Sequence, residues 1–242
     1  MSLYHDFASH YDFIFPTDET TLSFLQHSFR LGEILDLGCA TGGYALSLST
    51  LGYAVDGIDL DERMISIAKS KAADTFLDVR FRLEDMLQLD AKDRYEGIYC
   101  IGNTLVHLPN IHSIEKMLQL MYHALRDGGT AIVQIVNYDR ILDQHIEHLP
   151  AIEHAGRLFQ RRYSWRDSSL LFQSKLTYES ELYQGETPLL PLCSQELLNR
   201  FKAVGFEDLE WFGDFDRERF DPATSFAFVV KAKKPAAVSL DQ

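Results

Sequence analysis

The segment from Ile34 to Ser49, ILDLGCATGGYALSLS, constrains the fold of this chain more than any other feature. Its first residues predict a short buried strand, residues 38–43 supply a tight turn, and the apolar spacing from Tyr44 onward predicts a helix. Gly38 and Gly42 permit close backbone approaches that a side chain would block, so a ligand can lie against the turn at the helix N-terminus. Many such turns serve packing alone, so the pattern needs support from elsewhere in the chain.

Three acids give that support, because each stands near the end of a predicted strand. Asp36 lies in the first strand, Asp59 ends a strand over residues 53–58, and Asp85 follows a strand over residues 79–83. The carboxyl ends of parallel strands meet at one sheet edge, where open α/β sheets bind their ligands. We therefore expect the three carboxylates to converge around one ligand.

Asp59 has two interpretations. It stands 23 residues after Asp36, a spacing that fits a strand–helix–strand unit. An acid at the tip of the second strand can accept hydrogen bonds from both ribose hydroxyls, in methyltransferases and dehydrogenases alike. The alternative is a cap for the helix that follows, a role that Asp61 fits better.

Asp36 favours one of those two ligand classes. A carboxylate two residues before Gly38 would repel a pyrophosphate but suits S-adenosylmethionine, which carries a sulfonium and an ammonium. The stretch resembles the first motif of the class I S-adenosylmethionine-dependent methyltransferases, hydrophobic-hydrophobic-Asp-x-Gly-Cys-x-x-Gly. Ala40 replaces the common middle glycine, and we expect a slightly different backbone path there rather than a lost site.

The resemblance implies a cofactor site along the first four strands. In that family an acid after the third strand accepts a hydrogen bond from the adenine amino group, and Asp85 with Met86 matches this pattern; the alternative is a solvated loop at Glu84 and Asp85. The residues expected at S-adenosylmethionine are Tyr11, Asp36, Gly38, Cys39, Ala40, Asp59, Leu60, Met64, Asp85, Met86, Ile101 and Asn103.

The loop after the fourth strand indicates which group within that family the chain resembles. Residues 102–109, GNTLVHLP, resemble the Gly-Asn-Ser-x-x-His-Leu-Pro string of the glycine and sarcosine N-methyltransferases, which also carry Asn-Tyr-Asp where this chain has residues 137–139. The resemblance implies that Asn103 lies near the amino acid end of the cofactor and that Asn137 faces the substrate. His107 is a candidate general base. The alternatives are a structural role for His107 and a capping role for Asn137.

Two segments outside the sheet are candidate lids. Residues 1–31 hold many aromatic side chains and a predicted helix, and the resemblance implies that Tyr11 faces the methionine end of the cofactor; Tyr11 is also a second candidate base. The alternative is that the aromatic side chains fasten this helix to the sheet. Residues 140–193 interrupt the sheet pattern with predicted strands over 158–165 and 170–183, which indicates an inserted antiparallel hairpin.

The inserted hairpin is where we expect the substrate to be selected. Arg161 and Tyr163 are candidate substrate ligands, with Arg162 and Trp165 beside them; the alternative for each is an ordinary hairpin residue. Residues 189–191, Leu-Leu-Pro, stand where relatives carry aromatic residues before the lid proline, which points to a less polar or larger acceptor.

Composition argues against several other classes of function. The net charge of -13 and the pI near 5.0 disfavour a nucleic-acid partner, which needs clustered Lys and Arg. The three cysteines lie far apart without metal-ligand spacing, so we expect free thiols, a reducing compartment and no metal site. No stretch approaches the ~20 apolar residues of a membrane span, and we expect a cytoplasmic protein without a membrane partner. Oligomeric state leaves no signal here.

Together these features predict one α/β domain over residues 1–242, with a Rossmann-like, seven-stranded, mostly parallel sheet in the order 3-2-1-4-5-7-6. The predicted activity is methyl transfer from S-adenosylmethionine to a small-molecule acceptor, in the first place an amine nitrogen. In-line displacement needs alignment rather than a covalent intermediate or a metal. The alternatives are an NAD-dependent oxidoreductase and a non-catalytic S-adenosylmethionine-binding regulatory protein.

Overall fold

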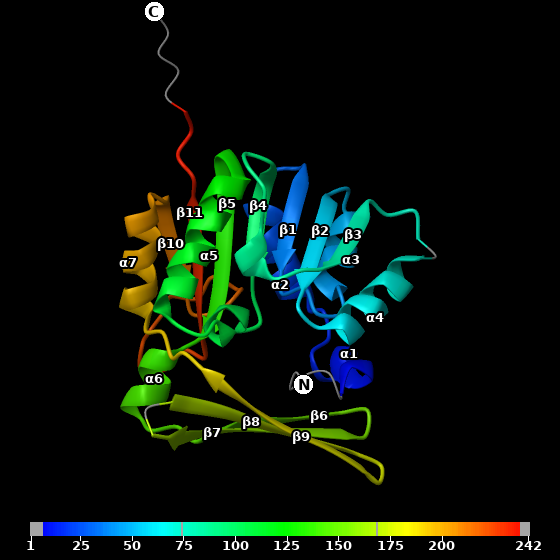
Figure 1. Ribbon diagram of the computed structural model, residues 1–242. Coiled ribbons are helices and arrows are strands. Elements are labelled where there is room, and N and C mark those ends of the chain that lie inside the picture. Colours follow the sequence, from blue (N-terminus) through cyan, green and yellow to red (C-terminus); the bar gives the residue numbers. More distant parts are fainter. Residues whose placement is uncertain (1–6, 74, 168, 238–242) are drawn as a thin grey trace, which may run out of the picture.

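A seven-stranded sheet forms the centre of the computed structural model, which describes residues 7–73, 75–167 and 169–237 (Figure 1). Strands β1 to β5 are parallel, β11 pairs antiparallel with β5, and β10 pairs antiparallel with β11. The order β10-β11-β5-β4-β1-β2-β3 confirms the predicted order 3-2-1-4-5-7-6. The strands are β1 Glu33–Leu37, β2 Ala54–Asp59, β3 Val79–Leu83, β4 Tyr95–Cys100, β5 Leu125–Val136, β10 Glu207–Phe212 and β11 Ala227–Lys233.

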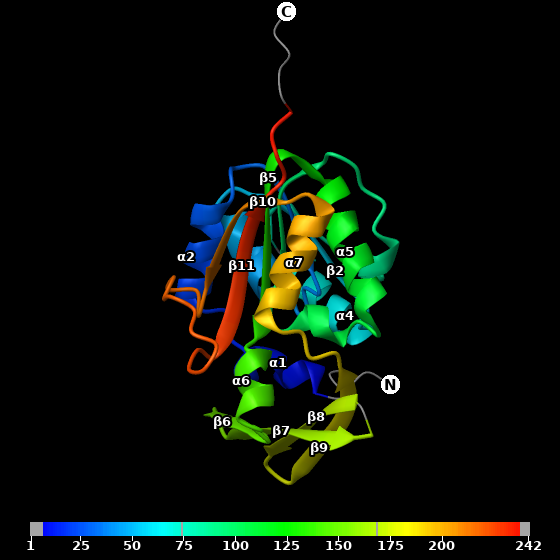
Figure 2. The same ribbon diagram turned by 90° about the vertical axis from the view of Figure 1, so that its left-hand side faces the viewer.

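Helices cover both faces of this sheet (Figure 2). One face packs against α2 (Glu19–Ser28), α3 (Gly43–Thr50) and α4 (Glu62–Ala73), and the other against α5 (Ile111–Ala124) and α7 (Ser194–Val204). The sequence dictates these faces: the apolar stripe of α5, formed by Ile114, Met117, Leu118 and Met121, is wholly buried, and the N-cap Asn110 accepts a hydrogen bond from the Ser113 amide at 2.9 Å. No helix among the described residues has the length and apolar character needed to cross a bilayer.

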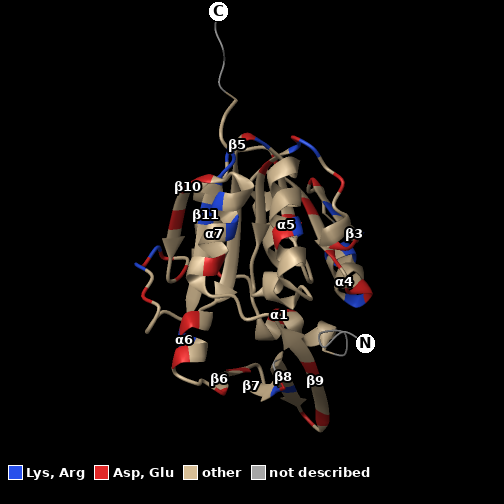
Figure 3. Ribbon diagram, turned by 60° about the vertical axis from the view of Figure 1, so that its left-hand side comes forward, with Lys and Arg blue, Asp and Glu red and all other residues tan. Residues whose placement is uncertain are grey.

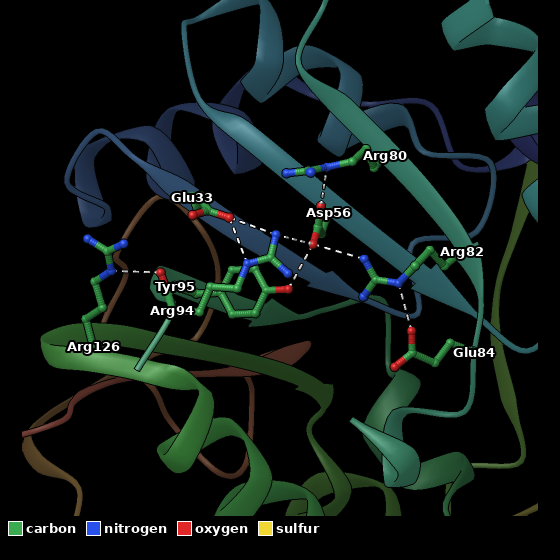
Figure 4. A network of polar contacts seen from close by, with 8 residues as sticks. All are labelled: Glu33, Asp56, Arg80, Arg82, Glu84, Arg94, Tyr95 and Arg126. Atoms are coloured by element: carbon green, nitrogen blue, oxygen red, sulfur yellow. Dashed lines mark hydrogen bonds and ion pairs between the residues drawn. The ribbon is translucent and has the colours of Figure 1, made fainter. Parts of the chain in front are cut away.

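A buried carboxylate holds the sheet together between β1, β2, β3 and β4 (Figure 4). Asp56 is only 2% exposed, and its oxygens accept from Arg80 at 3.1 Å, Arg82 at 3.0 Å, Arg94 at 2.9 Å and the Tyr95 hydroxyl at 2.9 Å. Burial alone would raise the pKa of Asp56, but these partners bring it below its ordinary value. Several donors therefore compensate one buried charge.

A second, four-stranded antiparallel sheet stands apart from the first (Figure 1). The inserted lid was predicted as a two-stranded hairpin, and the structure has four strands: β6 His148–His154, β7 Arg157–Arg166, β8 Ser169–Tyr178 and β9 Glu181–Leu189. The predicted strand over 170–183 is two strands because the chain turns at Glu179, which has a positive φ of 53°. That turn contains neither Gly nor Pro, so it leaves little trace in the sequence.

The N-terminal segment lies between the two sheets (Figures 1 and 2). It forms a 3-10 turn η1 (Ala8–His10) and a short helix α1 (Tyr11–Ile14). Phe7 and Ile14 pack with Phe159 and Leu176 of the second sheet, so these N-terminal side chains do not fasten the segment to the main sheet alone. The first six residues of the predicted 1–31 lid lie outside the described residues.

Positions of Lys and Arg and positions of Asp and Glu are interspersed along the ribbon in Figure 3, and neither kind is confined to one part of that view. The connection from β3 to β4 carries only the 3-10 turn η2 (Met86–Gln88), and that from β4 to α5 carries η3 (Thr104–His107). A short helix α6 (Tyr138–Asp143) links β5 to the second sheet. These short elements stand at the edge of the main sheet that faces the second sheet (Figure 1).

Candidate active site

The glycine turn between β1 and α3 begins the site. The amides of Gly38 and Cys39 both donate to the carbonyl of Ile58 on β2, at 2.8 and 3.0 Å. A Cβ added at Gly38 would meet the Thr104 side chain at 2.4 Å, so only glycine permits this approach of the turn to η3. The turn therefore joins three strand ends in one place.

Ala40 takes a backbone conformation that suits glycine. Its φ is 47°, in the left-handed region that L-residues adopt at some cost. Its amide donates to Asp59 Oδ2 at 2.9 Å. Ala40 thus keeps the turn although it replaces the middle glycine of the family motif. The alanine backbone is strained there.

Asp59 and Asp61 divide the two roles that the sequence left open. Asp61 Oδ1 accepts from the amides of Arg63 and Met64 at 3.0 and 3.2 Å and so caps α4. Asp59 accepts instead from Ala40 and from the Asp61 amide, each at 2.9 Å, with one carboxylate oxygen for each bond. Each oxygen retains a further lone pair for a ligand, and the ribose role of Asp59 stays a prediction.

Asp36 is a buried acid that lacks a cationic partner among the described residues. It is 4% exposed, and the Tyr99 hydroxyl donates to Oδ2 at 2.8 Å. Burial raises the pKa of Asp36 to about 8 despite that hydrogen bond, and burial also raises the pKa of Asp59. Burial raises the pKa of the Cys39 thiol between them as well. A nearby positive charge favours the ionised form of an acid, so a cationic ligand would stabilise the carboxylates of Asp36 and Asp59.

The predicted adenosine contacts lie at the next strand ends. Leu60 is an exposed apolar side chain, 68% exposed, directly after Asp59, whereas Met64 and Met86 are buried. Asp85 Oδ1 accepts from the Leu87 amide at 2.9 Å and caps η2, which leaves its second oxygen for a ligand. Among these residues, Leu60 and Asp85 present groups that a nucleoside could contact; Met64 packs in the core.

Asn103 connects the loop after β4 to β5 and α6. It has a φ of 68°, its Nδ2 donates to the Tyr138 hydroxyl at 3.0 Å, and its Oδ1 accepts from the Val136 amide at 2.9 Å. Its predicted contact with the cofactor would therefore use its backbone. Ile101, just before it, is partly buried against the core. His107 ends η3, where burial lowers its pKa to about 4.

Asn137 has the structural role that was its alternative. It is 1% exposed, its Oδ1 accepts from the Arg140 amide at 3.2 Å, and its Nδ2 donates to the carbonyls of Pro222 and Ser225 at 3.1 and 2.9 Å. The side chain thus caps α6 and fastens the loop between β10 and β11. Both its polar atoms are engaged there, and the expectation that Asn137 faces the substrate stays a prediction.

The second sheet separates the predicted substrate residues by face. Tyr163 lies on the inner face, is 2% exposed, packs 6.5 Å from the Tyr138 ring, and burial raises its pKa to about 12. Arg161 shares that face by alternation, and its Nη2 donates to the Pro150 carbonyl at 2.8 Å. Arg162 takes the opposite face and pairs with Glu147. Arg161 and Tyr163, and not Arg162, remain the predicted substrate ligands.

The leucines at the end of β9 have structural contacts. Leu189 is 5% exposed, and the Leu190 amide donates to the Val106 carbonyl of η3 at 2.9 Å. These contacts fix the second sheet next to His107. They account for apolar residues here without reference to the acceptor.

Sequence reasoning missed the N-terminal contacts that join both sheets. Thr41 Oγ1 of the glycine turn donates to Asp12 at 2.5 Å, and Lys71 of α4 pairs with Asp12 at 2.9 Å. On the other side, Arg157 of β7 donates to His10 Nδ1 at 3.0 Å. In the sequence, the adjacent Tyr11 and Asp12 were the one available sign of these N-terminal contacts. No local pattern marks the contact between Arg157 and His10.

Tyr11 lies within this N-terminal segment. Its ring stands 5.1 Å from that of Phe15, and it packs on the cluster shared with the second sheet. The expectation that Tyr11 faces the cofactor stays a prediction. The contacts of Asp12 and Arg157 place Tyr11 between the glycine turn and the second sheet.

Comparison with known proteins decides the class. Residues 34–129, from β1 into β5, match the family model described as a methyltransferase domain. The chain is an S-adenosylmethionine-dependent methyltransferase. The cofactor of this methyltransferase is accordingly S-adenosylmethionine, and the oxidoreductase alternative is excluded.

The similarity to known relatives extends well beyond residues 34–129. This methyltransferase is 26% identical over 205 residues to a glycine/sarcosine N-methyltransferase of Aphanothece halophytica, covering 84% of this chain and 76% of the relative. It is 27% identical over 216 residues to one of Halorhodospira halochloris, covering 87% and 80%. Its fold is similar to that of the CcbJ methyltransferase from Streptomyces caelestis, with a TM-score of 0.83 at 24% identity over 97% of this chain and 99% of that one.

Proposed function

We propose that this methyltransferase transfers the methyl group of S-adenosylmethionine to the nitrogen of a small-molecule amine by in-line displacement. The observation that carries the proposal is the chemistry of His107, the first candidate base. Burial lowers the pKa of His107 to about 4. A hydroxyl acceptor needs a base poised near neutral pH, whereas a neutral amine brings its own lone pair.

The relatives support the same choice of acceptor. The two reported above are named for N-methylation of glycine and sarcosine, both of them amines. The alignments with these relatives include both the glycine turn of the main sheet and the inserted sheet, since they cover more than four fifths of this chain. We carry over the amine and not the particular acceptor.

Under this proposal the main sheet holds the cofactor by its strand ends. Asp36 faces the positive charge, Asp59 accepts from the ribose hydroxyls, and Asp85 accepts from the adenine amino group. Gly38 and Ala40 supply the backbone surface on which the cofactor lies. Their combined task is alignment of the methyl group with the nitrogen lone pair, which can supply ~7 to 11 kcal/mol of the barrier.

The proposal is tested by methyl transfer from labelled S-adenosylmethionine to amines and to matched alcohols and phenols. We expect transfer to amines only, with a rate that rises with pH until the acceptor amine is fully neutral. The same profile is expected for His107→Gln. Transfer to a hydroxyl acceptor, with a pH dependence that His107→Gln abolishes, would contradict the proposal.

A further inference from the structure

Arg157 of β7 is a buried cation of the second sheet. It is 9% exposed, and its guanidinium lies over the Phe13 and Tyr178 rings, 3.8 and 4.1 Å from their centroids. Its Nη1 donates to the Ala155 carbonyl at 2.8 Å, and its Nε donates to His10 Nδ1 at 3.0 Å. No carboxylate pairs with Arg157 among the described residues. Two rings and two acceptors therefore fix the position of this guanidinium.

The contact with Arg157 requires a neutral His10. A guanidinium Nε–H can only donate, so His10 Nδ1 must supply a lone pair and carry no proton. A protonated ring has a proton on both nitrogens, so it would lose this bond and place two positive charges in contact. His10 is 8% exposed, and its ring lies 5.1 and 5.5 Å from those of Tyr178 and Tyr183. Burial and the neighbouring guanidinium both lower the pKa of His10.

The charges around His10 compensate a proton only in part. The titratable and charged groups that flank it on the packed elements are Asp12 on α1, Arg63 and Lys71 on α4, His154 on β6, Arg157 on β7, Tyr178 on β8, and Glu181 and Tyr183 on β9. Glu181 favours the protonated ring, but its effect is smaller than those of burial and Arg157. Asp12, the other acid of this group, already pairs with Lys71 at 2.9 Å.

The His10 contact holds one of two ends of the N-terminal segment. Two residues further on, Asp12 accepts from Thr41 of the glycine turn at 2.5 Å and pairs with Lys71 of α4. Histidine is the side chain whose ordinary ionisation changes between about pH 5 and 8, whereas a carboxylate, a hydroxyl and an ammonium keep theirs. A proton in this range therefore acts on the His10 end and not on the Asp12 end.

We infer that the contact between His10 and Arg157 is a proton-operated latch, which holds the second sheet against the N-terminal segment while His10 is neutral and releases it when His10 takes up a proton. The segment itself stays on the glycine turn through Asp12. The apolar contacts of Phe7 and Ile14 with the second sheet remain, so the latch changes how often that sheet opens rather than whether it folds. The inference does not depend on the identity of the methyl acceptor.

The sign of the pH dependence follows from the direction of the pKa shift. A released His10 has the ordinary pKa of 6.5, above that of the latched ring, so the latch is complete above about pH 6.5 and weakens as the pH falls through both values. Each pH unit below the ordinary value favours the protonated, released ring by up to tenfold. Mild acid should therefore open the second sheet.

Amide hydrogen exchange of the full-length protein, corrected for the intrinsic effect of pH on exchange, tests the latch. We expect the opening of β6–β9 to become up to about tenfold more frequent between about pH 7.5 and about pH 5.5, with no faster exchange in the glycine turn or α3. Equal opening at both pH values, or equally faster exchange in α3, would overturn the latch.

Matched variants assign the proton to His10. His10→Asn places an amide oxygen near the position of Nδ1, where it accepts from Arg157 but does not titrate, and His10→Phe keeps a ring without an acceptor. We expect the opening of neither variant to depend on pH, and His10→Phe to be more open than the wild type at about pH 7.5. His154→Asn removes an exposed histidine directly opposite Arg157 on β6 and should keep the wild-type dependence.

The ratio of opening at the two pH values is the quantity compared, because lost ring packing affects both values alike. A wild-type ratio in His10→Asn, or a lost pH dependence in His154→Asn, would show that the proton acts elsewhere and would overturn the latch.

Discussion

We call the strand ends that carry Asp36, Asp59 and Asp85 the cofactor edge of the main sheet. The cofactor edge and the inner face of the second sheet depend on contacts between residues at very different separations along the chain. At the cofactor edge Ala40 binds Asp59, 19 residues away, within one strand–helix–strand unit. At the second sheet Arg157 binds His10, 147 residues away. The comparison teaches that the contact between the glycine turn and Asp59 lies within one local unit, whereas the inner face of the second sheet packs on a segment from the other end of the chain.

The largest expected effect concerns Asp56, the buried carboxylate of the main sheet. Asp56→Ala leaves the buried Tyr95 hydroxyl and the partly exposed guanidinium groups of Arg82 and Arg94 without their shared acceptor, so the free energy of unfolding should fall by about 3 kcal/mol. Glu96→Ala removes a carboxylate that pairs with the exposed Arg30 and Arg126 and accepts from no buried donor within the described residues, and should cost about 0–1 kcal/mol. Urea unfolding measures both, and equal losses would contradict the role given to Asp56.

Loss of the Arg157 contacts with the N-terminal segment should loosen the second sheet and leave the main sheet unchanged. Arg157 is 9% exposed, lies over the Phe13 and Tyr178 rings at 3.8 and 4.1 Å, and donates to His10. Arg157→Met keeps the apolar stem and should lower the free energy of local opening of β6–β9 by about 2 kcal/mol. Amide hydrogen exchange reports this, with Arg162→Met as the control. Equally faster exchange in β1–β5 would show that the two sheets open together.

The cofactor edge should show a proton linkage. Because burial raises the pKa of Asp36 to about 8, the folded, ligand-free protein retains a proton that the unfolded chain releases near pH 4. Stability without ligand should therefore fall as pH rises from about 4 to about 8. A cationic cofactor favours the ionised acid, so its affinity should rise up to about tenfold per pH unit below pH 8.

Calorimetry in buffers of different ionisation enthalpy measures that linkage directly. We expect proton release when S-adenosylmethionine binds at pH 7, and none from Asp36→Asn. Proton uptake by the wild type would contradict the placement of Asp36 beside the positive charge.

The smallest effect concerns the turn itself. Ala40→Gly relieves a left-handed alanine, so the free energy of unfolding should rise by about 1 kcal/mol without loss of cofactor affinity. Ala45→Gly makes the same change five residues later, inside α3, and should destabilise by at least about 1 kcal/mol. Thermal unfolding compares them, and effects of the same sign would refute the strain at Ala40.

The cofactor edge was predictable because its signals are local. Strand periodicity, the glycine turn and acids at strand ends determine where Asp36, Asp59 and Asp85 lie. The left-handed conformation of Ala40 was not foreseen, because nothing in its side chain favours it. The capping role of Asn137 was one of its two interpretations, but its Nδ2 bonds to a loop some 85 residues away could not be seen in its own neighbourhood.

The second sheet was only partly predictable. β6 contains Pro150, which weakens its strand signal, and the turn at Glu179 lacks Gly and Pro. Which of Arg161 and Arg162 faces inward depends on the register and on which side the main sheet lies, and adjacent residues in a strand give no hint of that.

The account's central claim is that the strand-end acids hold the cofactor and the second sheet selects the acceptor. Calorimetric titration of S-adenosylhomocysteine into the wild type, Asp59→Ala and Arg161→Met tests it most directly, with Asp90→Ala as a control on an exposed loop. We predict that Asp59→Ala weakens binding by about 100-fold, the value of two charge-assisted hydrogen bonds, and that Arg161→Met and Asp90→Ala leave it unchanged. Unchanged affinity in Asp59→Ala, or an equal loss in Arg161→Met, would contradict the claim.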